Sequence, residues 1–382
     1  MKIRTITAGI NLLKKTKYSN LKPTVGFLKK AKEKFESYGS VVQSIRLSTQ
    51  PWYKYIKGLK VEEIIENLIE LENFCKENRI DFISIGAVDK SEYIEIIPTI
   101  IKNTTITSCS VTIGNKKNSI NLDILKKSAE AIIEISKLTN KGIGNFNFAV
   151  IINCPSDIPF FPASYHKGRP CFSIGTESGD LITKAFRGSK GLLEARNNLK
   201  HIFKINYNEI DRIAKSLNYK NAPLYKGIDI SPAPSLNEEE SIAFAFENLL
   251  KDKFGKPGTL SIAGMITDVI NEIDVKRCGY CGLMLPILED AGLSKRYKEK
   301  TFTISNLLDY SAICGTGLDC IPLAGNIKVE EIERILLDVS MLSFKLSKPL
   351  SARLLPCPGK KVGESTEFNS PYLIDSVIRD IG

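Results

Sequence analysis

Apolar positions along the chain follow two alternating spacings. Short runs rich in Ile, Val and Phe are typical of buried strands, whereas apolar residues that recur every three or four positions predict amphipathic helices. The predicted strands are 3–12, 41–48, 82–86, 107–113, 146–154, 171–174, 224–230, 282–288 and 351–355. The predicted helices are 23–38, 61–78, 123–138, 192–217, 238–250 and 329–346, and 258–273 fits either type. Strands that alternate with helices predict an α/β protein with a parallel or mixed sheet.

The extent of this alternation bears on domain number and location. No break in composition marks a linker, so we expect a single domain over 1–382. No apolar run approaches the length of about 18 residues that spans a bilayer. The first seven residues alternate polar and apolar types and do not form the apolar block of a signal peptide. We therefore expect a cytoplasmic protein without membrane contact.

The net charge of +10 is concentrated near the N-terminus. Residues 1–60 contain fourteen lysines and arginines against only Glu33 and Glu36. The clustered cations are Lys14, Lys15, Lys17, Lys29, Lys30, Lys32 and Lys34. A basic face can attract nucleic acid, but no recognition motif or interleaved aromatic platform accompanies these lysines. We predict weak, salt-sensitive binding and no specific nucleic-acid partner.

Nine cysteines, an odd number, are scattered along the chain and favour reduced thiols over a disulfide framework. The spacing of Cys278 and Cys281 is that of a metal-binding pair, but no second pair follows and the chain has only two histidines. This is a poor structural zinc site. Two small residues buried in a glycine-rich segment are the preferred interpretation.

Carboxylates lie in glycine- and proline-rich segments of the second half, at 229–234, 285–292 and 314–319. Each segment follows a strand-like run, and loops at strand ends commonly form a shared site. We assign Glu289 and Asp319 as catalytic acid–base groups, and Asp229 and Asp290 as tentative metal ligands. Oxygen ligands suit magnesium, calcium or manganese. Alternatively, Asp290 serves only as a helix N-cap.

A fourth such segment, 353–363, contains Lys360 and Lys361 between two glycines. Two lysines in a tight turn could bind a carboxylate or a phosphate, and a solvated turn is the alternative. We assign both lysines as ligand-binding residues.

The segment 154–170 contains His166 close to Asp157 and Tyr165. Its prolines and adjacent phenylalanines predict a stiff, buried, non-helical loop. His166 is a candidate acid–base catalyst because imidazole titrates near neutral pH. We assign Asp157 and Tyr165 to ligand binding and expect His166 to share one site with Glu289 and Asp319. A loop histidine hydrogen-bonded to the backbone is the alternative.

The end of this loop and the sequences Glu289-Asp290-Ala291-Gly292, Gly317-Leu318-Asp319 and 358–363 resemble the "PFL family" of uncharacterised prokaryotic proteins. That family is named for a distant likeness to pyruvate formate-lyase. The resemblance implies a ten-stranded α/β barrel like the cores of pyruvate formate-lyase and ribonucleotide reductase large subunits. Its two half-barrels would be about 1–153 and 171–356, and 154–170 would be a finger loop inside the barrel.

The resemblance implies no reaction. Glycyl radical enzymes carry a C-terminal Arg-Val-x-Gly pattern, which is absent from the nearest stretch, 353–359, and this argues against Cys154 or Cys314 as thiyl carriers. We predict a non-radical enzyme that acts on a small polar or anionic metabolite by acid–base or metal-assisted chemistry. A non-catalytic metabolite-binding or sensor protein is the alternative, and a homo-oligomer is compatible with either.

Overall fold

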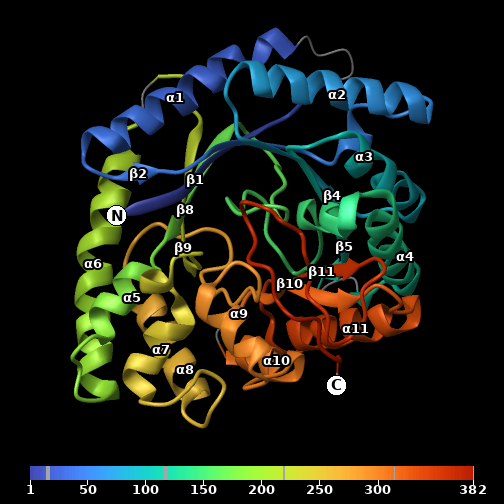
Figure 1. The fold of residues 1–382 in the computed structure, drawn as a ribbon. Coiled ribbons are helices and arrows are strands. Elements are labelled where there is room, and N and C mark those ends of the chain that lie inside the picture. Colours follow the sequence, from blue (N-terminus) through green and yellow to red (C-terminus); the bar gives the residue numbers. More distant parts are fainter. Residues whose placement is uncertain (14–17, 116–118, 218–219, 314, 382) are drawn as a thin grey trace.

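The computed structural model describes residues 1–13, 18–115, 119–217, 220–313 and 315–381. Its strands lie at the centre of the molecule and its helices surround them (Figure 1). The strands are β1 Lys2–Ile10, β2 Val41–Val42, β3 Ile45–Thr49, β4 Phe82–Val88, β5 Thr107–Asn115, β6 Ser119–Ile120, β7 Phe148–Ile152, β8 Cys171–Glu177, β9 Leu224–Ala233, β10 Gly317–Ala324 and β11 Leu350–Cys357. The helices are α1 Lys22–Ser37, α2 Val61–Glu77, α3 Ile97–Asn103, α4 Leu122–Leu138, α5 Gly179–Phe186, α6 Leu192–Ser216, α7 Ile242–Leu250, α8 Thr259–Glu272, α9 Ala291–Lys298, α10 Ile304–Ile313 and α11 Val329–Leu346.

The sheet is mixed and has 11 strands, with the order β10-β11-β7-β5-β4-β3-β1-β8-β9 and the short β2 and β6 beside β1 and β5. A central block of β1, β3, β4, β5 and β7 is parallel. The pair β8–β9 runs antiparallel to β1, and the pair β10–β11 runs antiparallel to β7. The predicted α/β class with a mixed sheet is therefore confirmed.

Closure into a barrel is a separate question. Within the described ranges, β9 and β10 share no ladder, and the segment 277–283 forms only the isolated β-bridges Ile228↔Arg277 and Leu283↔Gly315. The observed structure is thus a large central sheet flanked by helices. Closure of this sheet into the predicted ten-stranded barrel is not shown by the described strands.

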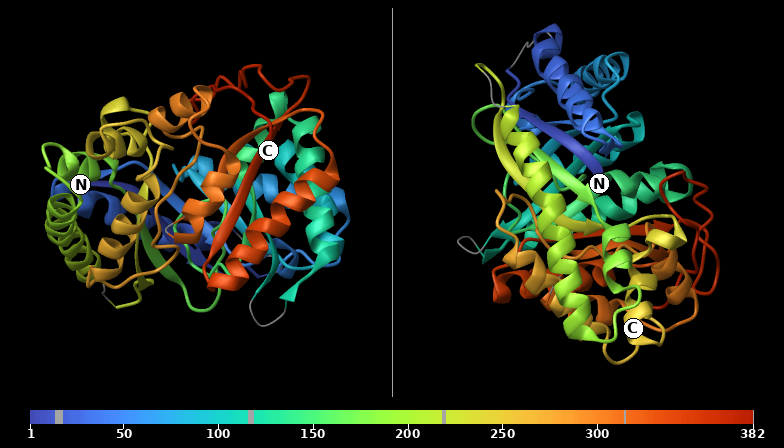
Figure 2. Two further views of the ribbon diagram at one scale, coloured as in Figure 1. Left: turned by 90° about the horizontal axis from the view of Figure 1, so that it is seen from below. Right: turned by 90° about the vertical axis from the view of Figure 1, so that its left-hand side faces the viewer.

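The sheet is buried because helices cover it and the finger loop, residues 154–170, packs against it. The amphipathic helices α4 and α11 lie on one side of the molecule and the long α6 lies on the other, in agreement between the views of Figure 1 and Figure 2. Strand hydroxyls bind the finger loop: Thr7 Oγ1 donates to the Pro159 carbonyl at 2.9 Å, and Ser84 Oγ donates to that of Ser164 at 2.6 Å. Small polar residues in apolar strands therefore hold the loop.

Several predicted elements differ from the structure. The segment 282–288 is irregular apart from its one bridge, so the predicted strand there is wrong. Conversely, Asp319 lies in the strand β10, where the sequence predicted a loop, whereas Asp229 and Arg353 lie in β9 and β11, which include the predicted strands 224–230 and 351–355. Glycine and proline in these segments suggested turns, but tertiary pairing overrides that local preference. The ambiguous segment 258–273 forms α8.

Two further expectations concern the basic and cysteine residues of the sequence and the contact with a membrane. Lys14, Lys15, Lys17 and Cys314 lie outside the described residues. Among the residues that are described, no helix combines the length and the apolar character needed to cross a membrane.

Candidate functional site

Three arginines from different strands converge on one cavity of about 340 Å³. Arg4 lies on β1, Arg46 on β3 and Arg353 on β11. Residues 160–163 of the finger loop line the same space, as do Glu289 and Asp319. We call this space the arginine cavity.

Arg353 joins the two predicted catalytic carboxylates. Its Nε lies 2.6 Å from Asp319 Oδ1, and its Nη2 lies 2.6 Å from Glu289 Oε1. Its guanidinium also lies 4.9 Å from the centre of the Phe146 ring, within the range of a cation–π contact. Arg4 lies 3.7 Å from the other oxygen of Glu289. The structure therefore brings Glu289 and Asp319 together, with Arg353 between them.

The two carboxylates differ in their electrostatic environment. Burial raises the pKa of Asp319, and the nearby Glu289 carboxylate opposes a second negative charge, while Arg353 only partly offsets both effects. For Glu289, burial is outweighed by the charges of Arg353 and Arg4, which hold its pKa below the ordinary value. Two interacting carboxyl groups with pKa values shifted in opposite directions can act as a proton carrier and a fixed charge.

Arg46 differs from the other two arginines because none of the described carboxylates forms an ion pair with it. Its guanidinium lies between the rings of Phe82 and Phe161, 5.1 Å from each centre. Asp81 is nearby, but its Oδ2 accepts a hydrogen bond from the Ile45 backbone N–H at 2.8 Å. Burial and the charge of Arg4 lower the pKa of Arg46 to about 9. Arg46 therefore remains positive at neutral pH without an ion-pair partner among the described carboxylates.

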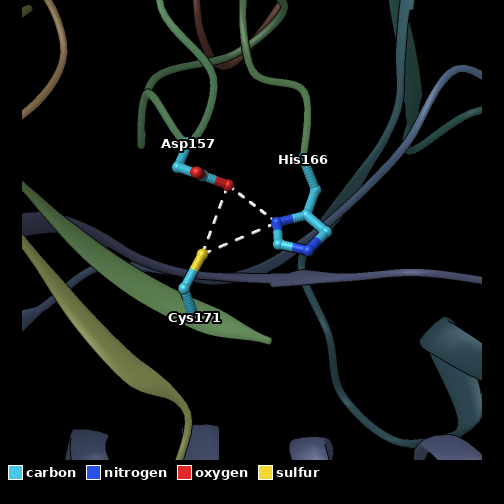
Figure 3. A group of neighbouring side chains, drawn as sticks. All are labelled: Asp157, His166 and Cys171. Atoms are coloured by element: carbon cyan, nitrogen blue, oxygen red, sulfur yellow. Dashed lines mark hydrogen bonds and ion pairs between the residues drawn. The ribbon is translucent and has the colours of Figure 1, made fainter. Parts of the chain in front are cut away.

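The finger loop forms a second polar cluster with β8. Asp157, His166 and Cys171 are buried and point toward one another (Figure 3). Asp157 Oδ1 lies 2.7 Å from His166 Nδ1 and 3.2 Å from Cys171 Sγ, and the sulfur lies 3.6 Å from His166 Nδ1. Lys226 Nζ lies 3.1 Å from Asp157 Oδ2. We call Asp157, His166 and Cys171 the histidine cluster.

The neighbours of Asp157 stabilise its negative charge, whereas the same charge opposes ionisation of the Cys171 thiol. Burial opposes ionisation of Asp157, but its bonds to His166, Cys171 and Lys226 lower its pKa. Burial, reinforced by the Asp157 charge, raises the pKa of the Cys171 thiol, which makes it a poor nucleophile in the absence of a cation.

The arginine cavity and the histidine cluster lie at opposite ends of the strands. Arg4, near the start of β1, contacts Glu289, whereas Gly9, near its end, packs against His166. Arg4 and Gly9 are five residue steps apart along β1, which corresponds to about 17 Å. His166 is buried, as expected, but the structure does not bring it to Glu289 and Asp319 because the finger loop extends along the strands. It lines a different cavity of about 820 Å³, together with Tyr165.

The two tentative metal ligands make hydrogen bonds that hold the backbone. Asp229 is fully buried and accepts bonds from the backbone N–H groups of Ser231, Tyr280 and Cys281. Asp290 accepts from Ile242 N–H and Leu293 N–H and is the N-cap of α9. The two carboxylates are thus used by the fold, and the capping alternative for Asp290 agrees with the structure.

The remaining predicted ligand groups lie away from the arginine cavity. Lys360 forms an ion pair with Glu367 at 2.8 Å, and Lys361 is exposed in the same turn. Tyr165 donates its hydroxyl to the Cys154 carbonyl at 3.0 Å. Neither lysine is among the residues that line the arginine cavity.

Sequence reasoning missed four residues of these two sites: Arg4, Arg46, Arg353 and Cys171. A signal was present, since each arginine interrupts an otherwise apolar or small-residue strand. A charged residue inside a buried strand must have a partner or a function. Cys171 lies only five positions after His166, at the start of the strand that follows the finger loop.

Relatives of similar length support the assignment to a family. The chain is 27% identical to the "UPF0210 protein" of Methanococcus aeolicus and 26% identical to that of Limosilactobacillus reuteri, in each case over 96% of this chain and 88% of the relative. It is 24% identical to the "UPF0210 protein MJ1665" of Methanocaldococcus jannaschii, with the same coverage. The predicted resemblance to a family of uncharacterised proteins is confirmed in that form. The chain belongs to the family described as "Uncharacterised ACR (DUF711)", whose model matches residues 1–369.

Proposed function

We propose that the arginine cavity binds a small metabolite that carries a carboxylate or phosphate group, and that Asp319 exchanges a proton with it. The observation that carries this proposal is Arg46, a cation at the cavity wall without an ion-pair partner among the described carboxylates. A guanidinium presents paired N–H donors that match carboxylate and phosphate oxygens. An anion would supply the missing charge.

The rest of the cavity suits an anion of limited size. Its volume of about 340 Å³ lies at the lower end of small-molecule sites. Phe160, Phe161 and Tyr372 line the same cavity and can contact an apolar part of the ligand. Arg353 is already neutralised by two carboxylates, so we assign it to positioning Asp319 and not to binding charge.

Asp319 is the proposed acid–base group because its pKa is raised and its side chain is still 19% exposed. Glu289 carries the negative charge that Arg353 and Arg4 stabilise. This division of roles needs no radical.

We also retain the proposals of a single domain over 1–382 and of a barrel like that of pyruvate formate-lyase. The antiparallel arrangement of the flanking strand pairs supports the barrel.

The test is isothermal titration calorimetry with inorganic phosphate, malonate and citrate, and with glycerol as a neutral control. We expect at least one of the anions to bind the wild type, and Arg46→Gln to weaken that binding at least tenfold, as loss of a charge-assisted pair implies. The matched control Arg334→Gln removes an exposed arginine on α11 and should change nothing.

Three results decide among the alternatives. Equal affinity in wild type and Arg46→Gln, or no binding of any of the three anions, contradicts the proposal. If an anion binds and Asp319→Asn retains its affinity, turnover of a metabolite library by the wild type but not by Asp319→Asn identifies an enzyme. Binding without turnover favours the sensor alternative.

A further inference from the structure

We propose that the histidine cluster is a divalent metal site of the zinc type that ties both ends of the finger loop to β8. Asp157 lies near the start of that loop, His166 near its end, and Cys171 is the first residue of β8. This site is distinct from the arginine cavity and does not depend on the function proposed for it.

The hydrogen-bond pattern of His166 is the main observation. Its Nε2 lies 3.1 Å from the carbonyl oxygen of Gly168, an acceptor, so Nε2 carries a hydrogen. In a neutral ring Nδ1 is then an acceptor as well, yet it lies 2.7 Å from Asp157 Oδ1. Two acceptors this close require a proton or a cation between them. The buried Cys171 sulfur next to both atoms suggests the cation.

The donor set and its spacing suit zinc. An imidazole nitrogen, a carboxylate oxygen and a thiolate are all ordinary zinc ligands. In a tetrahedral site their bond lengths place nitrogen and sulfur about 3.6 Å apart and nitrogen and oxygen about 3.3 Å apart. The observed separations are 3.6 Å between nitrogen and sulfur and 2.7 Å between nitrogen and oxygen. Only the carboxylate must move outward, by about half an ångström.

The groups around the cluster hold each ligand in position. Asp157 Oδ2 is bound by Lys226 Nζ at 3.1 Å and by Ser156 Oγ at 3.0 Å, which leaves Oδ1 directed inward. The Gly168 carbonyl fixes the His166 ring with Nδ1 toward the cluster. Such outer hydrogen bonds to a histidine and a carboxylate are typical of metal sites.

The structure leaves room for a metal ion at the histidine cluster and a route by which it can enter. Gly9 packs directly against the ring, since a Cβ there would lie 2.3 Å from His166 Nδ1 and 3.0 Å from Cys171 Sγ. His166 also lines the cavity of about 820 Å³, which gives an ion a route to the cluster. Three protein ligands leave a fourth position for water.

Metal binding must be balanced by loss of protons. A cysteine thiol is protonated at neutral pH without a metal, and without a metal a proton also lies between His166 Nδ1 and Asp157 Oδ1. When a divalent ion binds, the S–H and Nδ1–H bonds break, the sulfur and the nitrogen donate their electron pairs to the metal, and both protons pass to solvent. Zinc uptake should therefore release about two protons per chain near neutral pH.

The first test uses the metal ions themselves. Protein freed of metal by a chelator under reducing conditions is titrated with Zn²⁺ in a weakly buffered indicator solution, and then with Co²⁺ under visible spectroscopy. We expect one ion per chain, release of about two protons, and a thiolate-to-cobalt charge-transfer band. Cys171→Ser and His166→Gln should each bind Zn²⁺ at least tenfold more weakly and lose that band.

Matched controls assign the thiolate. Cys278→Ser changes the CxxC pair and Cys109→Ser changes a buried strand cysteine, and both should leave affinity and band unchanged. Lys226→Met, which removes an outer contact of Asp157, should weaken binding roughly tenfold. If Cys171→Ser does not fold, proton release and the cobalt band of the wild type, together with the two cysteine controls, decide the question.

The competing outcome is that a proton, and not a metal, lies between His166 and Asp157. Absence of stoichiometric zinc binding, zinc binding without proton release, or a cobalt band that survives Cys171→Ser or disappears in Cys278→Ser contradicts the proposal. Anion binding at Arg46 would be unaffected by any of these results, so the two sites are tested separately.

Discussion

Replacing Arg353 by methionine tests whether the arginine is what allows two carboxylates to lie at the cavity wall. The substitution keeps much of the side-chain volume against Phe146 but removes the partner of both Glu289 and Asp319. Removing one member of a buried ion pair typically costs about 3–5 kcal/mol, because the remaining charge loses its compensation.

The lower end of that range is expected here for two reasons. Glu289 would keep Arg4 at 3.7 Å, and the Asp319 side chain is 19% exposed to solvent. Both features reduce the penalty. We therefore expect the free energy of unfolding to fall by about 3 kcal/mol at pH 7.

The sign of the pH dependence follows from the carboxylates. In the wild type the lowered pKa of Glu289 gives stability above its unfolded value, and this is lost as the pH falls through its folded value. Without Arg353 we expect both carboxyl groups to have folded pKa values above their unfolded ones, which destabilises the fold at neutral pH. Protonation relieves that penalty, so the difference between wild type and variant should shrink as the pH falls from 7 toward about 4.5.

The assay is urea unfolding followed by fluorescence of Trp52, the single tryptophan of the chain, which is fully buried. The control Arg196→Met breaks a surface pair with Glu272 and should leave the unfolding midpoint nearly unchanged. Adding Glu289→Gln to Arg353→Met should recover part of the lost stability. A loss below about 1 kcal/mol, or a loss that is the same at pH 7 and at about pH 4.5, would contradict this prediction.

Two other substitutions test the framework around these sites. Glu72→Gln should destabilise the protein by about 1–3 kcal/mol at pH 7, because the buried carboxylate accepts bonds from Thr105 N–H, Ile106 N–H and the Thr107 hydroxyl. Although burial opposes it, these bonds and Lys76 lower the Glu72 pKa, so the gap in urea unfolding between wild type and variant should close as the pH falls below about 4.5; a gap that persists in acid contradicts this. Gly9→Ala should cost about 1–3 kcal/mol and abolish zinc binding, since its Cβ would overlap His166. Gly26→Ala in α1, where a Cβ meets no atom within 4 Å, should raise the free energy of unfolding by up to about 1 kcal/mol in the same urea experiments. Similar effects of Gly9→Ala and Gly26→Ala would contradict the packing argument.

Much of the fold could be predicted because apolar periodicity reports burial directly. The central strands and the helices α2, α4 and α11 appear close to the predicted ranges, since each buries a continuous apolar run or stripe. The segments that misled us contain glycine and proline. β10 includes Gly317 and Pro322, which are turn signals locally, yet it pairs with β11.

The site was predictable only in part. Glu289 and Asp319 were found because acidic residues near glycine are conspicuous, and the structure places them on one arginine. The arginines themselves are far apart in sequence, at positions 4, 46 and 353. In the sheet, β7, β5 and β4 lie between β11 and β3, so only the tertiary fold brings Arg353 to the cavity of Arg4 and Arg46. No local pattern could reveal that the finger loop would carry His166 to the other end of the strands.

Arg46 and its neighbours are proposed to bind an anion in the arginine cavity. The most direct measurement is anomalous diffraction from crystals soaked in selenate, a tetrahedral dianion with a strong scatterer. We expect a peak in the arginine cavity, with a selenate oxygen within about 3 Å of the Arg46 guanidinium, and its absence in crystals of Arg46→Gln. A cavity without selenate while the anion occupies the turn of Lys360 and Lys361, or a peak that persists unchanged in Arg46→Gln, would contradict the proposal.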